Sequence, residues 1–133
     1  STEMFLKSTK VQQLYAIDPW RGCYNDAAAY ETPDFSLVES AFDERVKNYN
    51  VIKLKMTMLE AFNMLPELDA VYIDGNHEYS YVLEDIKLSL QKVKKGGFIC
   101  GHDYLLPDVM QAVKELLTEP NKVFSDQSWI VQI

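Results

Sequence analysis

The chain of 133 residues is poor in cysteine, in basic residues and in long apolar runs. Its two cysteines, Cys23 and Cys100, lie in an expected loop and an expected strand, which is no disulfide framework and favours a reducing compartment. With 13 Lys and Arg against 20 Asp and Glu, the net charge of −7 opposes a nucleic-acid partner, because phosphate binding needs a basic surface. No apolar run reaches the roughly 18 residues of a membrane span, and no secretory leader opens the sequence. We therefore expect a soluble, cytoplasmic protein whose partner is a small molecule.

Length and composition predict one domain. A chain of this size that is 47% hydrophobic can bury one core, and nothing in its length asks for a second. We find no internal repeat, low-complexity tract or linker, so residues 1–133 are expected to form a single domain. Residues 22–34 are the one long irregular stretch, and loops of that kind often act as lids.

Strand-like and helix-like segments alternate along the chain. The expected strands are residues 11–17, 51–56, 68–73 and 98–100, and a closing hairpin is expected from residues 123–124 and 129–133. Residues 68–73 and 98–100 are apolar enough for strands covered on both faces. This alternation predicts an α/β fold in which neighbouring strands are parallel.

Helices are expected where apolar residues recur at intervals of three and four. These residues are Val38, Phe42, Val46 and Tyr49, then Val82, Leu83, Ile86, Leu90 and Val93, and then Met110, Val113, Leu116 and Leu117. Thr32 and Pro33 suit the start of the first helix. Lys92, Lys94, Lys95 and Gly96 suit the carboxyl-terminal end of the second.

Polar side chains follow two successive apolar strands. Asp74 ends the strand at residues 68–73, and His77 comes three residues later, after a Gly-Asn turn. His102 and Asp103 follow the strand at residues 98–100 in the same way. Because ligands of open α/β sheets bind at the carboxyl ends of the strands, we interpret these four residues as a site.

Three blocks of the sequence carry a family resemblance that spans almost the whole chain. They are Ala-Ile-Asp-Pro-Trp at residues 16–20, Asp-Ala-Val-Tyr-Ile-Asp-Gly-Asn-His-Glu-Tyr at residues 69–79, and Gly-Gly-Phe-Ile-Cys-Gly-His-Asp-Tyr at residues 96–104. Together they resemble the methyltransferase-24-like branch of the class I S-adenosylmethionine-dependent methyltransferases. The resemblance implies a Rossmann-like sandwich with a mostly parallel sheet and a C-terminal β-hairpin. It also implies methyl transfer from S-adenosylmethionine to a small hydroxylated acceptor.

The resemblance also implies roles for particular residues. In such enzymes the acidic residue that ends the second strand binds the cofactor's ribose, a place that Asp18 holds here, and a carboxylate can accept hydrogen bonds from two hydroxyl groups. Trp20 would wall the cofactor or substrate pocket, Thr57 would contact adenine, and Asp74 would also face the cofactor. The expected cofactor-binding residues are therefore Asp18, Trp20, Thr57 and Asp74.

A divalent metal is implied by similarity to metal-dependent O-methyltransferases. Asp74, His102 and Asp103 match the register of their ligands, and His77 matches the position of a general base. An ion there would hold the acceptor's hydroxyl oxygens and lower their pKa, and a neutral imidazole could take the proton. Magnesium and manganese are the expected ions, while two carboxylates and an imidazole also suit iron or zinc.

The chain departs from the family at its beginning. Class I methyltransferases open with a strand and a glycine-rich loop, whereas residues 1–6 resemble the helix that follows that loop. We therefore expect a partial domain that lacks the usual first strand. Strands exposed by that absence would favour a homo-oligomer.

Structural explanations of the same residues stay open. Asp74 with Gly75 could make a turn and cap the next helix, and Asp18 could make a turn with Pro19. His102 and Asp103 could be a hydrogen-bonded pair that holds a loop. Two other functions also stay open: an inactive, truncated module that acts in oligomerisation or binding, and a metal-dependent hydrolase or hydroxylase. No nucleophilic Ser or Cys motif accompanies the cluster.

Overall fold

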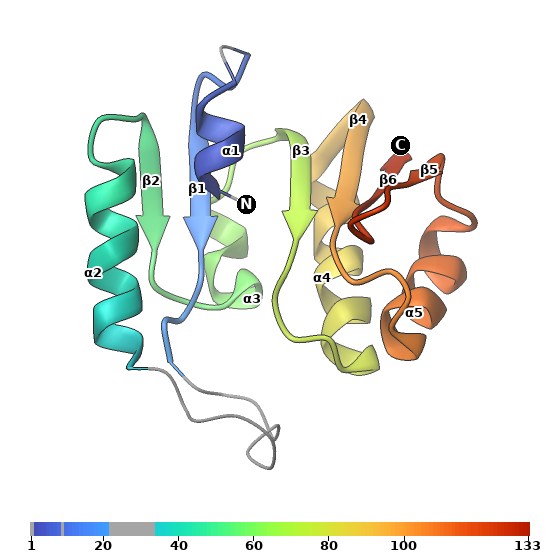
Figure 1. The fold of residues 1–133 in the computed structure, drawn as a ribbon. Coiled ribbons are helices and arrows are strands. Elements are labelled where there is room, and N and C mark those ends of the chain that lie inside the picture. The colour runs from blue at the N-terminus through green and yellow to red at the C-terminus, as the bar shows by residue number, and fades with distance from the viewer. Residues whose placement is uncertain (1, 9, 22–33) are drawn as a thin grey trace. The chain divides into compact units, whose positions relative to one another are not determined.

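The computed structural model describes residues 2–8, 10–21 and 34–133 (Figure 1). They fall into two compact units, Ser1–Ala61 and Phe62–Ile133. The expected loop at residues 22–34 lies outside the described residues except for Asp34, and so does Cys23. None of the helices in the described ranges has the length and apolar character that spanning a bilayer requires.

The first unit is built on two parallel strands. Its elements are α1 (Thr2–Leu6), β1 (Leu14–Ile17), α2 (Phe35–Val46), β2 (Val51–Leu54) and α3 (Met58–Ala61). Leu14 pairs with Val51 and Ile17 with Leu54, so β1 and β2 run in the same direction. Both strands were expected, but β1 begins three residues later than predicted and β2 ends two residues earlier.

Helix α2 begins at Phe35, directly after its N-cap Asp34. The carboxylate of Asp34 accepts hydrogen bonds from the backbone N–H of Ser36 at 3.0 Å and from its hydroxyl at 2.6 Å, so Asp34 is the N-cap. Thr32 and Pro33, which we expected at this boundary, lie outside the described residues. Of the apolar positions that predicted the helix, Val46 is buried and Val38 is exposed.

The second unit contains a mixed sheet of four strands. Its elements are η1 (Phe62–Met64), β3 (Leu68–Ile73), α4 (Tyr79–Lys92), β4 (Val93–Gly101), α5 (Pro107–Leu117), β5 (Lys122–Val123) and β6 (Trp129–Gln132). The strand order is β3-β4-β6-β5. Strands β3 and β4 are parallel, and β6 is antiparallel to both β4 and β5. The expected closing hairpin is therefore present, and the mixed α/β content with parallel strands is that of a Rossmann-like fold.

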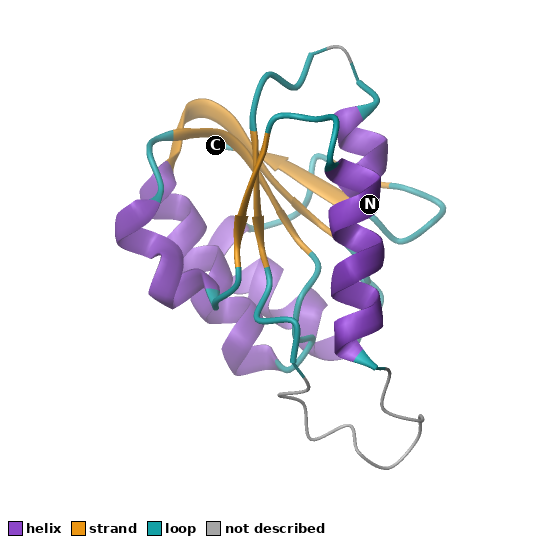
Figure 2. Cartoon of the chain, turned by 90° about the vertical axis from the view of Figure 1, so that its left-hand side faces the viewer, coloured by secondary structure: helices purple, strands orange, loops and turns teal. Residues whose placement is uncertain are grey.

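Helices α4 and α5 lie side by side against one face of this sheet (Figures 1 and 2). The core between them is closed by fully buried side chains, which include Ile86 of α4, Ile99 of β4, Val113 of α5 and Trp129 of β6. On the other face, Ala70 and Phe98 are neighbours in register and both are exposed. Burial of both faces, which the apolar sequence predicted, is therefore not found at this pair.

The boundary between α4 and β4 differs from the prediction. The helix ends at Lys92, and the next residues already belong to β4, which has nine residues where three were expected. Lys94 forms an ion pair with Asp69 of β3. Gly96 adopts a φ of 85° and donates its N–H to the Ile133 carbonyl at 2.7 Å. Lys92 therefore ends the helix as expected, whereas Lys94 and Lys95 are part of a strand that contacts distant in sequence hold in the sheet.

Gly101 is a point of close packing in the sheet. A β-carbon at this position would lie 2.6 Å from the Ile73 carbonyl oxygen and 2.7 Å from Cζ2 of Trp129. Both neighbours are fixed, one as backbone and one as the largest fully buried side chain of the described core.

Gly101→Ala is expected to lower the free energy of unfolding by about 2 kcal/mol or more, because the added methyl group overpacks a rigid contact. Urea denaturation followed by tryptophan fluorescence measures the loss. Gly75→Ala is the matched control, since a β-carbon there would meet only an ordinary contact at 3.8 Å. Equal stability of the two variants would show that the contact at Gly101 relaxes freely.

Candidate functional site

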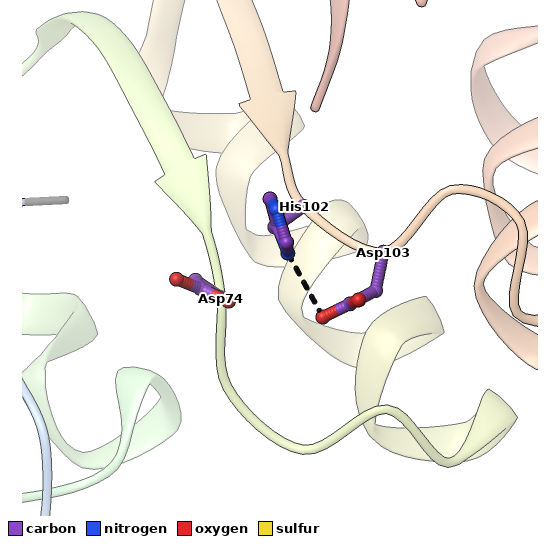
Figure 3. Close-up of side chains that lie close together, drawn as sticks. All are labelled: Asp74, His102 and Asp103. Atoms are coloured by element: carbon purple, nitrogen blue, oxygen red, sulfur yellow. Dashed lines mark ion pairs between the residues drawn. The ribbon is translucent and has the colours of Figure 1, made fainter. Parts of the chain in front are cut away.

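The candidate site lies where β3 and β4 end. Ile73 and Gly101 pair in register, so the residues that follow them, Asp74 and His102, leave neighbouring strands at the same edge. Figure 3 shows Asp74 on one strand end and His102 and Asp103 on the other. Each of the three offers a ligand atom, and these atoms all lie within 4.8 Å of one another. The structure therefore brings together the three expected metal ligands, while ligation itself stays a prediction.

The backbone around His102 is held from two sides. Its N–H donates to the Ile73 carbonyl at 3.1 Å, and its carbonyl accepts from the indole N–H of Trp129 at 3.2 Å. Asp103 follows with a φ of 55°, in the left-handed region that Asp and Asn tolerate better than most residues. Its carbonyl accepts from the N–H of Leu106 at 3.0 Å. These bonds fix the direction in which His102 and Asp103 leave the sheet.

One carboxylate oxygen of Asp103 faces two imidazole rings. Oδ2 lies 3.0 Å from Nδ1 of His102 and 3.0 Å from Nε2 of His77. The hydrogen bond to Asp103 raises the pKa of His102, burial opposes that shift, and the charge of Asp74 adds to it. His102 therefore carries more positive charge near neutral pH than a solvated imidazole.

The ring of His77 is placed less tightly. Its Nε2 is enclosed, yet the contact with Asp103 is not aligned as a hydrogen bond, and Nε2 has no other partner among the described residues. A cavity of about 10 Å³ borders this ring, the ring of His102 and the indole of Trp129, which is space for about one water molecule. Catalytic hydrogen bonds often align only when substrate binds. The geometry therefore permits, without fixing, the expected role of His77 as a base.

Residues other than Asp74 satisfy the start of α4. Asn76 accepts from the N–H of Glu78 at 2.9 Å, and Asp108 of α5 accepts from the N–H of Tyr79 at 3.0 Å. The structural alternative, in which Asp74 caps this helix, is therefore wrong, because Asn76 and Asp108 accept these hydrogen bonds. Sequence reasoning missed Asp108, because its partner lies 29 residues away and no local motif announces the bond.

The chemistry of the cluster fits a divalent cation. Two carboxylates supply the oxygen ligands that magnesium and manganese prefer, and an imidazole is a common ligand of manganese and other transition metals. Oδ2 of Asp103 already faces both imidazoles, and Nδ1 of His102 faces Asp103. Asp103 can therefore orient His77 through Oδ2 while its carboxylate also binds an ion, as outer-shell partners of metal sites do.

The other expected cofactor residues belong to the first unit. An open hollow of about 340 Å³ lies beyond β1 and β2, and its lining includes Trp20, Arg21, Lys55 and Glu60. Trp20 is buried, and its ring centroid lies 5.1 Å from that of Phe42. Trp20 thus borders a hollow, as expected of a pocket wall, and also packs in a core.

Asp18 and Thr57 have local hydrogen bonds. Oδ1 of Asp18 accepts from the N–H of Trp20, which is the turn that the structural alternative described. Thr57 and Glu60 form a capping box at the start of α3: Glu60 accepts from the N–H and the hydroxyl of Thr57, and Thr57 Oγ1 accepts from the N–H of Glu60. Asp18 and Asp74 belong to different units, so their expected binding of one cofactor stays a prediction.

The fold and the residues at its strand ends define an α/β protein of the class I methyltransferase type. The chain belongs to the methyltransferase-24 family, whose model, described as a methyltransferase domain, matches residues 2–104. It is 26% identical over 124 residues to the uncharacterized protein R132 of Acanthamoeba polyphaga mimivirus, a match that covers 90% of this chain. The chain spans about half of that relative's length, 55%.

Solved structures share the fold at low sequence identity. The O-methyltransferase NovP superposes with a TM-score of 0.62 at 16% identity, covering 98% of this chain and 64% of NovP. CalS11, a TDP-rhamnose 3′-O-methyltransferase of calicheamicin biosynthesis, gives a TM-score of 0.60 at 9% identity over 90% of this chain and 58% of that enzyme. SMU.1697c of Streptococcus mutans, a putative methyltransferase solved in complex with SAH, gives a TM-score of 0.56 at 16% identity. The match covers 98% of this chain and 93% of SMU.1697c.

Asp85 of α4 is a titratable group that the sequence did not single out. Its side chain is largely buried, and no hydrogen bond or ion pair to it is found in the described parts of the chain. Burial raises its pKa to about 6, and the nearby charge of Glu84 adds a smaller push. The spacing of apolar residues in α4 does not predict the burial of Asp85, because an aspartate on a helix usually lies in water.

Asp85→Asn is expected to stabilise the fold at pH 8 and to have little effect at pH 4. The folded-state pKa of about 6 exceeds the ordinary 3.8, so the folded state holds this proton more tightly and loses stability as pH rises from 4 to 6. The difference between the two pKa values corresponds to at most about 3 kcal/mol.

Urea denaturation of both proteins at pH 4 and pH 8 measures this effect. Glu84→Gln is the comparison variant and should stabilise the fold at pH 8 by less, because it removes only the smaller, electrostatic part of the shift in the pKa of Asp85. If the wild-type protein and Asp85→Asn are equally stable at pH 8, the carboxylate of Asp85 has a partner in solution.

Proposed function

We propose that this chain catalyses methyl transfer from S-adenosylmethionine to a hydroxyl group of a small-molecule acceptor. The observation that carries the proposal is the convergence of Asp74, His102 and Asp103, with His77 3.0 Å from the Asp103 carboxylate, in a chain of the methyltransferase-24 family. NovP and CalS11, which share the fold, are O-methyltransferases by name. That likeness supports an oxygen acceptor.

The reaction that we propose needs a base and an oriented hydroxyl group. When bound, S-adenosylmethionine supplies a methyl group on a positively charged sulfur. The acceptor oxygen forms a bond to that carbon as the carbon–sulfur bond breaks, and S-adenosylhomocysteine leaves. His77 takes the hydroxyl proton, and Asp103, which faces its Nε2, stabilises the resulting imidazolium. His77, Asp103 and His102 thus form a chain of proton-binding groups beside the acceptor.

Asp74, His102 and Asp103 would hold a divalent ion, magnesium or manganese. Such an ion supplies a positive charge that holds hydroxyl oxygens and lowers their pKa. Without it, the raised pKa of His102 still provides some positive charge at the same place. The proposal is therefore a metal-assisted site in which His102, as a neutral imidazole, is one of the three ligands.

Asp18, Trp20 and Thr57 are proposed to bind the nucleoside part of the cofactor, and Asp74 to face it from the second unit. The hollow of about 340 Å³ that Trp20 borders supports this, since it lies at the carboxyl ends of β1 and β2. The complex of SMU.1697c with SAH shows that a protein of this fold binds such a ligand. We propose a small molecule as the partner, with no nucleic acid and no membrane, on the basis of the net charge of −7. A homo-oligomer in the cytoplasm also stays part of the proposal.

The function is tested by incubating the purified chain with methyl-labelled S-adenosylmethionine and a panel of catechols, phenols and hydroxylated sugars. Labelled product and S-adenosylhomocysteine should form together, faster with Mg²⁺ or Mn²⁺ than with EDTA. If no member of the panel is methylated and titration with S-adenosylhomocysteine gives no heat, the chain is a binding or oligomerisation module instead. Turnover of an acceptor in the absence of the methyl donor would favour a hydrolase.

Asp74→Ala should abolish divalent-ion binding, because it removes one of two carboxylates that converge on the site. Titration with Mn²⁺, followed by electron paramagnetic resonance of the free ion, measures this. Asp69→Ala is the control, since Asp69 is an exposed carboxylate of the same strand outside the cluster. Unchanged Mn²⁺ binding by Asp74→Ala would remove Asp74 from the ligand set.

His77→Ala should lower kcat about 100-fold or more, because general-base catalysis contributes at least that factor. Affinity for S-adenosylhomocysteine should stay unchanged, since the base acts on the acceptor. Initial rates and calorimetric titration separate the two quantities. Lys87→Ala, on the exposed surface of α4, controls for unspecific effects. Full activity of His77→Ala would assign the base to another group.

A further inference from the structure

Asp85 lies against the turn that carries Asp74. Helix α4 runs back along β3, and Asp85 is positioned so that its Oδ2 faces Gly75, the residue directly after Asp74. The side chain is largely buried, and no donor reaches it from the described residues. Buried carboxylates are normally paired, because an uncompensated charge away from water is costly. An unpaired one beside a candidate site points to a missing partner.

There is space for that partner at Gly75. A β-carbon of Gly75 would have space, since apart from the two adjacent residues of the chain Oδ2 of Asp85, at 3.8 Å, is the one neighbour within 4 Å among the described residues. A nitrogen that enters this space needs to approach by only about 1 Å to reach hydrogen-bonding distance. The glycine thus leaves open a route to the carboxylate that any side chain at this position would obstruct.

The chemistry of the surroundings selects a cation that carries N–H groups. Asp85 lies beside the turn that carries the carboxylate of Asp74, so an anionic group is repelled. A desolvated carboxylate pairs more strongly with an ammonium group than a solvated one does. In the methyl donor, the sulfonium has no N–H, whereas the α-ammonium of the methionine part has three.

We propose that Asp85 binds the α-ammonium group of the methyl donor in the space beside Gly75. This inference rests on the proposed function, since it takes S-adenosylmethionine as the ligand. It assigns a binding contact to a residue of α4 that lies outside the cluster of Asp74, His102 and Asp103.

The test compares two ligands that differ by one ammonium group. They are S-adenosylhomocysteine and 5′-deoxy-5′-(3-carboxypropylthio)adenosine, which keeps the nucleoside, the thioether and the carboxylate. Calorimetric titration at pH 7.5 should show the first binding at least tenfold more tightly to the wild-type chain. Asp85→Asn should reduce this ratio to nearly one by weakening S-adenosylhomocysteine alone. Gly75→Ala should reduce it too, because its methyl group fills the space.

Glu84→Gln is the matched control and should keep the wild-type ratio, because it removes an exposed carboxylate next to Asp85. Thermal melting of each variant confirms that it is folded. An unchanged ratio in Asp85→Asn overturns the inference, and so does an equal loss for both ligands, which indicates a structural role. If the wild-type chain binds neither ligand, the proposed function is rejected and this inference falls with it. Binding of both ligands with equal affinity rejects the inference alone.

Discussion

The parallel pairing of β3 with β4 is the constraint on which the candidate site depends. It sets Ile73 beside Gly101, and the next residue of each strand then enters the site. The absence of a side chain at Gly101 allows the indole of Trp129 to lie against the strand, and that indole binds the His102 carbonyl. The positions of Asp74 and His102 thus follow from backbone pairing and from one close contact in the core.

The charges of the second unit are balanced unevenly. Asp103 faces two imidazole rings, so its carboxylate has nearby partners. Asp85 lies on α4 beside Gly75 and has no hydrogen-bond or ion-pair partner among the described residues. Burial raises its pKa to about 6. A fold usually pairs its buried carboxylates, and departures from that rule concentrate where a protein binds something. Asp103 is thus part of a preformed cluster, whereas the carboxylate of Asp85 is still without a partner among the described residues.

Much of this arrangement could be predicted from the sequence. The strand at residues 68–73 was predicted with its bounds, because its six apolar-rich residues end sharply at Asp74 and Gly75. The strand ends also predicted which polar residues would meet, since parallel strands place their carboxyl ends on one edge. The methyltransferase family was identified from the three blocks of residues and is confirmed by the family match.

The remainder depends on contacts that sequence patterns do not show. Lys94 and Lys95 resemble a helix end, but they lie in β4, where Val93 pairs with Leu68, Phe98 pairs with Ala70, and Lys94 forms an ion pair with Asp69. Asp108 binds the start of α4 from another helix, and the burial of Asp85 is a property of the packed unit. Each of these depends on which elements pack together, which is decided only when the chain has folded.

The bond from Trp129 to the His102 carbonyl has a consequence for biosynthesis. The cluster residues are all made by position 103, but the indole that binds the His102 carbonyl lies 26 positions further on, in β6. A ribosome has therefore released the polar groups of this edge well before their anchor emerges. Until then, His102 lacks one of these two backbone hydrogen bonds.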